Sequence, residues 1–551
     1  MVSRDPSVLI TVCLLAGALV GGGAASAAPP VPSKNRYEDL VSFFKDWRAF
    51  QKPKILDGAP DYSATAMASQ QRELEAWKKR LAAIDPSSWP IPKQVDYYVV
   101  RAELAGLDFD HRVLKPWANN PAFYVTVFPE ESDQPAREGP FAVGAVELWS
   151  YAFPLSAKNA ARIEAGVRAI PGLLAQAKIN LTGNGRDLWT YGAKSIHQQS
   201  ADLTTLATRL DGAPANLKAG VERARKATDD LAAWLDSKAE SKTGPSGVGV
   251  ENYNWYLKNV QLVPHTWQEE VALMERELAR SRALLAMEEL KNAKLPLQQP
   301  VVSDAGEYSR KFNEAVTEYM TFLKDREILT VKKYMDPALR AQIGRYSAGP
   351  REFFSEVDYR DPVIMRTHGY HWFDKGWMVN EPNASPIRRE VFLYNIFNTR
   401  TEGLATGWEE LMMQAGMFDE RPRSRELVYI LVAQRAARAL GELRMVSNEM
   451  TLEEAAAFAC ANTPRGWLSM DGNLVRAEQH LYLQQPGYGT CYLIGKLEID
   501  GLLADRKQEL GDRFRMKAFM DEFNAAGFVP ASLLRWEMTG KKSPALEKML
   551  R

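Results

Sequence analysis

Long stretches of helical periodicity constrain this chain to a mostly helical fold. Within Thr266–Asn292, Trp267 and the apolar residues after it recur at steps of three, four or seven, so they share one helical face. The stretch Arg425–Met445 is apolar nearly all round, which predicts a central buried helix. Two capping-box patterns, Thr266 with Glu269 and Thr451 with Glu454, mark helix starts. Further helical patterns cover Tyr37–Lys52, Met67–Ile84, Gln94–Leu107, Ser156–Ile179, Leu217–Ser237 and Tyr308–Asp325.

Alternating patterns typical of strands are scarce in this chain. The best are FYVTVF at Phe123–Phe128 and FAVGAVELW at Phe141–Trp149, and both are short. We therefore expect an all-α architecture, a large multi-helix domain with few or no strands. The polar, glycine-rich stretch Ser237–Val250 predicts a loop between an N-terminal helical half, 28–240, and a C-terminal half, 241–551, within one compact domain.

The N-terminal residues have the three-part layout of a secretory signal peptide. Arg4 precedes a short apolar run, and Ala25-Ser26-Ala27 offers small residues for cleavage, so we expect residues 1–27 to be removed near Ala27 or Ala28. Cys13, preceded by Val12, is a poor match to a lipoprotein cleavage site. The expected location is periplasmic or secreted, and no later segment is apolar enough for a membrane span.

The balanced charge of the chain argues against nucleic acid and anionic lipid as partners. The chain has 69 basic and 69 acidic residues, so it lacks the basic excess that nucleic acid or anionic lipid would attract. After cleavage, Cys460 and Cys491 are the cysteines that remain. We expect two free thiols, because a core this large needs no disulfide to stabilise it. The alternative is a disulfide between them, which an exported protein could form.

The stretch MRTHGYHWFDKGW carries the strongest candidate for a metal site. On a continuous helix, His368, His371 and Asp374 would lie on one face, and imidazole and carboxylate are the groups that Zn²⁺ prefers. A catalytic zinc site typically takes three protein ligands and leaves a position open. The alternative is an amphipathic helix whose imidazoles bind nearby carbonyl or carboxylate groups.

A second stretch, Glu402–Gly416, carries carboxylates that could serve the same site. Glu402 and Glu409, two helical turns apart, share a stripe opposite the apolar side of the predicted helix, and Glu410 lies to one flank. They could converge on one ion or hold a ligand histidine in its tautomer. The alternative is a solvated acidic face.

A third segment contains the remaining residues of interest. His480 precedes a glycine-rich turn, Gln484–Thr490, which Tyr482 and Tyr492 flank. An ordinary surface or hydrogen-bonded histidine is the alternative at position 480. The chain has no G-x-S-x-G nucleophile elbow and no nucleotide-binding glycine motif in a suitable context, which argues against a serine hydrolase of the α/β type or a nucleotide enzyme.

Four segments resemble a bacterial family known as the domain of unknown function 885, whose members look like all-α metallopeptidases with a central cleft. They are GVENYNWYLKNVQLVPHTWQEEVALMERELAR, TEGLATGWEELMMQAGMFDERPR, ELVYILVAQRAARALGELRM and EQHLYLQQPGYGTCYLIGKLEI. In typical members a His-Glu-x-x-Pro-Gly-His motif precedes an E-G-W glutamate by about thirty residues and supplies two zinc ligands and a base. Here that register reads MRTHGYHWFD, so His371 and Glu402 match, while the first histidine and the base glutamate have no counterpart.

The resemblance therefore implies a divergent site and two hypotheses. The first is an exported metal-dependent hydrolase, peptidase-like, that uses Zn²⁺ or another divalent metal and acts on short peptides or related amides. The second is a catalytically degenerate binding protein that binds no metal. For the hydrolase we expect metal ligands His368, His371 and Glu402, a replacement base among Asp374, Glu409 and Glu410, and substrate contacts from His480, Tyr482, Tyr488 and Tyr492.

Overall fold

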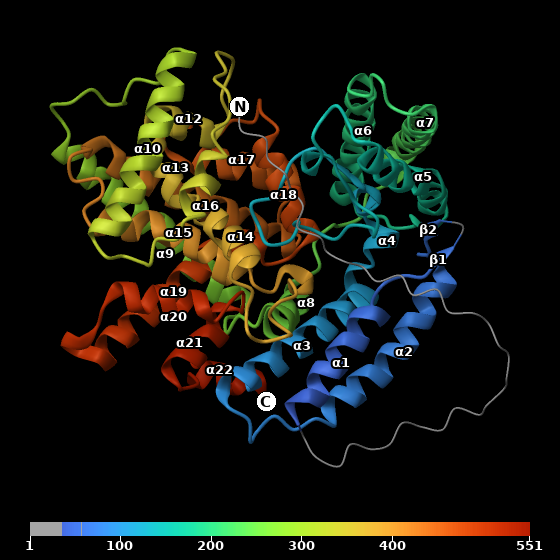
Figure 1. The fold of residues 1–551 in the computed structure, drawn as a ribbon, viewed down its shortest axis with the longest axis horizontal. Helices are drawn as coiled ribbons and strands as arrows, with labels where there is room; N and C mark the ends of the chain where they lie inside the picture. The colour runs from blue at the N-terminus through green and yellow to red at the C-terminus, as the bar shows by residue number, and fades with distance from the viewer. Residues whose placement is uncertain (1–35, 57) are drawn as a thin grey trace.

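The computed structural model describes residues 36–56 and 58–551, and these form the helical protein that the periodicity predicts (Figure 1). The expected signal peptide lies outside the described residues. Strands in the described chain are two residues long: β1 (Ile55–Leu56) pairs with β2 (Ala59–Pro60), and β3 (Val127–Phe128) runs parallel to β4 (Val146–Glu147). The second pair lies within the two stretches where strands were expected. The all-α class is confirmed.

The N-terminal part of the chain builds two groups of helices and a connecting segment. α1 to α3 lie side by side, and α5 to α7 form a separate bundle (Figure 1). Short turns of helix and a long irregular stretch between β3 and β4 connect the two groups. The helices are α1 (Tyr37–Phe50), α2 (Ala64–Ala82), α3 (Ile91–Phe109), η1 (Asp110–Leu114), α4 (Pro116–Asn119), η2 (Pro121–Tyr124), η3 (Leu148–Ser150), α5 (Ala157–Asn180), α6 (Arg186–Thr208), α7 (Ala215–Lys238) and η4 (Ala239–Ser241).

The C-terminal part is a larger assembly of helices around α16. The elements are α8 (Val250–Tyr256), η5 (Leu257–Gln261), α9 (Trp267–Lys291), α10 (Ala305–Asp325), α11 (Met335–Arg340), α12 (Phe353–Arg360), α13 (Pro362–His368), α14 (Tyr370–Asn380), η6 (Leu393–Asn395), α15 (Asn398–Gln414), α16 (Pro422–Val446), α17 (Leu452–Asn462), η7 (Pro464–Gly466), α18 (Leu474–Gln484), α19 (Tyr488–Leu510), η8 (Gly511–Arg513), α20 (Met516–Ala525), α21 (Ala531–Thr539) and α22 (Pro544–Leu550).

The main hydrophobic core crosses the boundary between the two halves. Buried side chains of α1 to α3, such as Trp47 and Val99, share one core with the C-terminal helices, including Trp408 of α15 and Trp536 of α21. The bundle α5–α7 has its own core. The first three helices therefore depend on the C-terminal half for burial, whereas the bundle α5–α7 buries its own apolar surface.

Several local predictions are confirmed in detail. α16 is buried along nearly its whole length, as expected of a helix that is apolar all round. Thr266 and Thr451 form complete capping boxes with Glu269 and Glu454. Cys460 and Cys491 are both free thiols, so the alternative of a disulfide is wrong. None of the helices within residues 36–56 and 58–551 is long and apolar enough to cross a membrane.

The close contact between α15 and α19 requires glycine on both helices. A Cβ atom on Gly403 would lie 2.4 Å from the Cα of Gly495, and one on Gly495 would lie 2.0 Å from the carbonyl oxygen of Thr399. Because neither residue has a side chain, the two backbones approach each other directly. This contact brings Glu402, next to Gly403, beside Tyr488 at the start of α19.

Candidate functional site

The two histidines of the MRTHGYHWFD stretch lie on different helices. α13 ends at His368, Gly369 has φ −60° and ψ 12°, and α14 begins at Tyr370, so the expectation of one continuous helix is wrong. A Cβ on Gly369 would lie 2.8 Å from Leu339 Cδ2, so close packing favours glycine at the break, although its backbone angles are open to other residues. The two rings remain close, with centroids 5.1 Å apart and planes at 81°.

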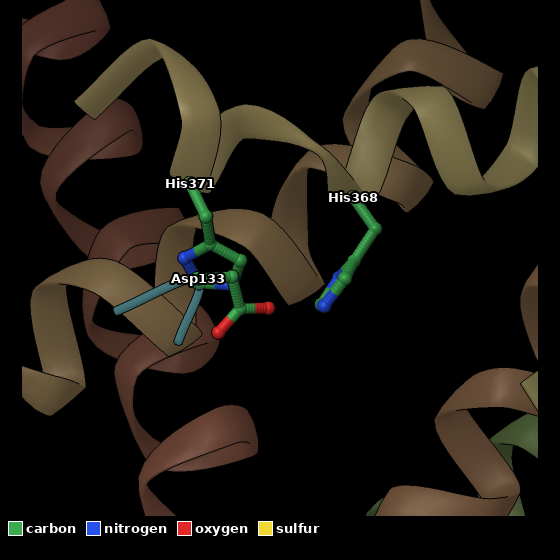
Figure 2. Close-up of side chains that lie close together, drawn as sticks. All are labelled: Asp133, His368 and His371. Carbon is green, nitrogen blue, oxygen red and sulfur yellow. The ribbon is translucent and has the colours of Figure 1, made fainter. Parts of the chain in front are cut away.

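A carboxylate from the N-terminal half joins these histidines. Asp133, in the irregular segment between β3 and β4, points toward both rings (Figure 2). Asp133, His368 and His371 each offer one ligand atom, and these atoms all lie within 4.8 Å of one another. Asp133, rather than Glu402, completes this group of three. Two imidazoles and a carboxylate are a donor set that suits Zn²⁺ and similar ions.

Glu402 approaches the group from α15 and contacts His371. Its Oε2 lies 3.2 Å from His371 Nε2, while its Oε1 accepts hydrogen bonds from Tyr488 Oη at 2.7 Å and from Gln134 Nε2 at 3.0 Å. Thr401 Oγ1 donates to Gln134 Oε1 at 2.8 Å and so fixes that amide. Glu402 is only 3% exposed, which makes the alternative of a solvated acidic face wrong.

His371 and Glu402 each stabilise the charged form of the other. Burial lowers the pKa of His371, but the carboxylates of Asp133 and Glu402 outweigh it and raise that pKa to about 9. Burial raises the pKa of Glu402, but His371 and the hydrogen bond from Tyr488 outweigh it and lower the pKa to about 2. The two side chains therefore form a buried ion pair, with the imidazolium of His371 beside the carboxylates of Glu402 and Asp133.

A second carboxylate of α15, that of Glu409, contacts His368. Its Nδ1 lies 3.0 Å from Glu409 Oε1, and Arg435 of α16 holds the same carboxylate with bonds of 2.8 and 2.9 Å. Burial opposes ionisation of Glu409, but Arg435 and His368 together lower its pKa. With Nδ1 engaged, Nε2 of His368 is left for a ligand, which is the usual arrangement of a metal-binding histidine.

Asp374 and Glu410, the other two carboxylates considered as the base, both form ion pairs. Asp374 of α14 is buried and bound to Arg400. Glu410 is held by Arg280 at 2.8 and 2.9 Å and lies 3.2 Å from Lys496. Glu410 lines a separate cavity of about 340 Å³ that contains none of the candidate metal ligands.

A further carboxyl group, Glu138, lies beside the site on the same irregular segment as Asp133. Its Oε1 is 3.4 Å from the hydroxyl of Tyr488, which donates to Glu402, and its Oε2 accepts a hydrogen bond of 2.9 Å from Ser132. Burial, with a smaller contribution from the charge of Asp133, raises the pKa of Glu138 to about 7. A carboxyl group that titrates near neutral pH is suited to general acid–base chemistry.

The aromatic residues expected to contact substrate cluster next to Glu402. The ring of Tyr488 lies 6.1 Å from that of Tyr482 and 5.8 Å from that of Tyr492, and the Tyr482 hydroxyl is buried without a hydrogen-bond partner. His480 is also buried, so a surface position is wrong. Burial lowers its pKa to about 3, and Gln484 contacts its Nδ1 at 3.2 Å.

The residues present fit a small divalent cation. Ligands at roughly 2.0–2.2 Å from a tetrahedral ion lie roughly 3.3–3.6 Å from one another, and the ligand atoms of Asp133, His368 and His371 all lie within 4.8 Å of one another. Glu402 Oε2 is buried and, apart from its ion pair with His371 at 3.2 Å, accepts no hydrogen bond within the described residues, so it keeps acceptor capacity at the site. We refer to Asp133, His368, His371 and Glu402 as the candidate metal centre.

The comparisons with known proteins agree with this architecture. The model of the family described as bacterial protein of unknown function, DUF885, matches residues 53–371 and 369–538. This chain belongs to the DUF885 family. No curated protein sequence matches it.

Two solved structures share the fold of this DUF885 member. One is a candidate lipoprotein of unknown function from Shewanella oneidensis, with a TM-score of 0.64 and 16% identity over 91% of this chain and 97% of that one. The other is a candidate lipoprotein from Colwellia psychrerythraea, with a TM-score of 0.63 and 15% identity over 93% and 98% of the two chains. At these identities the likeness shows the fold alone.

Sequence reasoning missed Asp133, Gln134 and Glu138 of this DUF885 member. They lie in PEESDQPAREGP, an acidic stretch with three prolines between the two strand patterns. A long irregular connection inside a compact domain is often functional, and that signal could have drawn attention to the segment. Its contact with the histidines joins residues more than 230 positions apart, which no local pattern indicates.

Proposed function

We propose that this protein is an exported metal-dependent hydrolase, peptidase-like, that acts on short peptides or related amides. The convergence of Asp133, His368 and His371 on one point carries the proposal. Three donors of this kind can hold a divalent cation and leave a coordination position open. The cation would supply Lewis-acid chemistry, because it polarises a carbonyl group and acidifies water.

The protein's own residues would position this chemistry. Glu409 fixes His368 through Nδ1, and Glu402 holds His371 from 3.2 Å. We assign Asp133, His368 and His371 as ligands and Glu402 as the group that orients His371. Tyr482, Tyr488 and Tyr492 form the aromatic cluster against which we expect a substrate amide to lie, while the ring of His480, also expected to contact substrate, packs against Tyr191.

Glu138 is the group that we assign as general base. Asp374, Glu409 and Glu410 are all bound to guanidinium groups, which favours their ionised form and occupies their oxygens. Within the described residues Glu138 forms no ion pair with a guanidinium group, although the charge of Arg137 acts on it, and it shares Tyr488 with Glu402. It can therefore take a proton from water beside the candidate metal centre, which is the role of the carboxylate missing from the MRTHGYHWFD stretch.

The proposed location is outside the cytoplasm. The N-terminal residues have the layout of a signal peptide, and two proteins of the same fold are described as candidate lipoproteins. A fusion of residues 1–40 to a reporter that is active only after export tests this directly. Export of the reporter is expected, and cytoplasmic retention would contradict the location.

Metal analysis of the purified protein tests the proposed function. We expect about one equivalent of Zn²⁺ or another divalent transition metal, lost in His371→Ala and retained in His197→Ala, an exposed histidine on α6 that pairs with Asp236. Peptidase activity on a panel of di- and tripeptides should be present in the proteins that bind metal and absent from the variant that does not. No metal binding after dialysis against Zn²⁺ or Mn²⁺, together with no hydrolysis, would overturn the proposal.

A comparison of Asp133→Asn with Glu402→Gln tests the assignment of ligands. Loss of a ligand should weaken metal binding more than loss of an orienting group, which typically costs about 10- to 100-fold. We therefore expect the larger loss for Asp133→Asn. The reverse order would assign the ligand role to Glu402, as the family resemblance implies.

A binding protein without catalysis is the second candidate. The observation that favours it is that all three carboxylates first considered as the base are held in ion pairs. On this hypothesis peptides bind without being cleaved, and His371→Ala leaves their affinity unchanged. A metal-dependent hydrolysis that His371→Ala abolishes would exclude it.

A further inference from the structure

A second site lies in the cavity on the other side of the segment that carries Asp133 and Glu138. The cavity has a volume of about 340 Å³, within the range of small-molecule sites. It is lined by α2, by α3 and η1, by residues 136–143, by the region of η6 and by the end of α18. Its walls are largely aromatic, with side chains from Tyr62, Trp117, Phe123, Phe141, Tyr256 and Tyr394.

One carboxylate faces this aromatic surface without a partner. Asp110, the first residue of η1, lines the cavity, and within the described residues it makes no ion pair and its side chain makes no hydrogen bond. Tyr62, Tyr256 and Tyr394 line the same cavity, and burial, with a smaller contribution from the charge of Asp110, raises the pKa of each hydroxyl group. Burial raises the pKa of Asp110 to about 8, as expected of a carboxyl group that lacks a cation.

One buried donor is also unsatisfied on the cavity wall. Gln485 is 5% exposed, and its Oε1 accepts hydrogen bonds from Gly139 N at 2.9 Å and from Asn395 Nδ2 at 3.1 Å. Its Nε2 is buried and has no partner within the described chain. Buried donors are usually paired, and Gln485 lines the cavity, so an acceptor group of a ligand would satisfy this amide.

The basic residues on the wall do not neutralise Asp110. Lys52 is exposed to solvent. Arg137 donates to the carbonyl oxygen of Glu130 at 2.7 Å, and its guanidinium lies 4.0 Å from the ring centre of Phe128. A ligand that satisfies the cavity must therefore offer a cation to Asp110, an apolar or aromatic body to the rings, and an acceptor to Gln485.

We propose that this cavity binds a primary ammonium group attached to an aromatic or bulky apolar body, as the N-terminal residue of a short peptide presents it. The peptide carbonyl after that residue would accept the free hydrogen bond of Gln485 Nε2. Tyr488 donates its backbone N–H to the carbonyl oxygen of Gln485 and its hydroxyl to Glu402, so the turn between α18 and α19 connects the cavity wall to the candidate metal centre. The inference that this cavity selects the N-terminal end of a peptide substrate rests on the proposed function. The inference that the cavity binds an ammonium compound does not depend on that function.

Calorimetry with four small probes tests this site on the full chain. We expect the dipeptide Phe-Gly and phenethylamine to bind, and N-acetyl-Phe-Gly, which has no ammonium group, to bind about 10- to 100-fold more weakly, the usual range for one charge-assisted hydrogen bond. Phe-Gly should bind more tightly than Glu-Gly, whose side chain is charged. Equal affinity for the acetylated and free dipeptides, or no binding of either ammonium probe, would overturn the proposal.

Two substitutions connect the binding to the residues named. Asp110→Asn keeps the shape of the side chain and should weaken Phe-Gly and phenethylamine alike, by about 10- to 100-fold. Gln485→Leu should weaken Phe-Gly alone, because phenethylamine has no carbonyl. If Gln485→Leu leaves the dipeptide unaffected, the ligand is an amine and the peptide assignment is wrong. Retained binding in Asp110→Asn would overturn the site itself.

The same measurements in His371→Ala separate this inference from the proposed function. Phe-Gly should bind this variant with unchanged affinity, because the cavity contains none of the candidate metal ligands. Binding without metal or hydrolysis would support the cavity while the proposed function fails. A loss of binding in His371→Ala, in a protein whose circular dichroism is unchanged, would show that the cavity is not an independent site.

Discussion

The imidazole of His368 and the carboxylate of Glu409 form a pair 3.0 Å apart on two helices that meet in the buried part of the protein. Glu409 is completely buried and is itself bound by Arg435. A carboxylate held in this way is a poor proton acceptor but a good support for a histidine ligand. The relationship therefore gives Glu409 an orienting role.

Glu409→Gln should weaken metal affinity by about 10- to 100-fold and leave the turnover of the metal-saturated protein nearly unchanged. The amide no longer fixes His368 as firmly, while the ligand itself remains. Competition with a chromophoric chelator measures the affinity. The variant also leaves Arg435 without its anion, so the free energy of unfolding should fall, by about 3 to 5 kcal/mol. Lost turnover at saturating metal would instead identify Glu409 as the base.

Glu138→Gln should lower kcat by a factor of about 10² to 10⁴, with metal content unchanged, because the amide cannot accept a proton. Steady-state kinetics on the best dipeptide, together with metal analysis, measures both quantities. Glu130→Gln, an exposed position on the same segment, is the matched control and should behave as the wild type. A fully active Glu138→Gln protein would return the role of base to Asp374, Glu409 or Glu410.

Gly495→Ala should destabilise the protein by about 1 to 3 kcal/mol, because the new methyl group would lie 2.0 Å from the carbonyl oxygen of Thr399. Separation of α15 from α19 would also move Glu402 away from Tyr488. Urea denaturation measures the change. Gly501→Ala, on the same helix, meets only the flexible Arg535 at 3.3 Å and should be neutral or stabilising. Equal stability of the two variants would contradict the close contact.

Stability should fall as pH rises from about 5 to 8, and Glu498 should account for part of that fall. Both of its carboxylate oxygens are buried without a partner, and burial raises its pKa from 4.5 to about 8. In this window the folded state binds a proton that the unfolded chain has lost, so stability decreases, at most by about 1.4 kcal/mol per pH unit.

Glu498→Gln should therefore flatten the dependence of the unfolding free energy on pH between 5 and 8. The difference between the wild-type and variant slopes, from urea denaturation at several pH values, isolates this one group. Burial also raises the pKa values of Asp110 and Glu270. These two groups therefore contribute to the pH dependence of the unfolding free energy in both proteins. Parallel curves for the two proteins would show that Glu498 is ionised throughout.

Sequence periodicity predicted many of the helices well. α9, α10 and α16 agree closely with the predicted ranges, and the threonine caps at 266 and 451 are present. α6 was missed, although it is a helix of 23 residues. Its buried residues Trp189, Ala193, Ile196, Leu203 and Leu206 recur at steps of three, four and seven, so the periodicity that predicts this helix is present in the sequence.

The candidate site was predicted only in part. His368, His371 and Glu402 were named from the sequence, and the structure brings them close together. The break at Gly369 was missed, because a single glycine inside a helical pattern does not by itself end a helix. Asp133 and Glu138 lie in an irregular segment and were not considered.

The sequence by itself determined which segments are helical and which residue types are available for chemistry, because both depend on side-chain periodicity and composition over short distances. Only the tertiary structure decided which carboxylates are free. Arg400, Arg435 and Arg280 engage Asp374, Glu409 and Glu410, whereas Glu138 and Asp110 form no ion pair in the part of the chain that the structure describes. Ion pairs between residues far apart in the chain depend on how helices pack, and no local pattern contains that information.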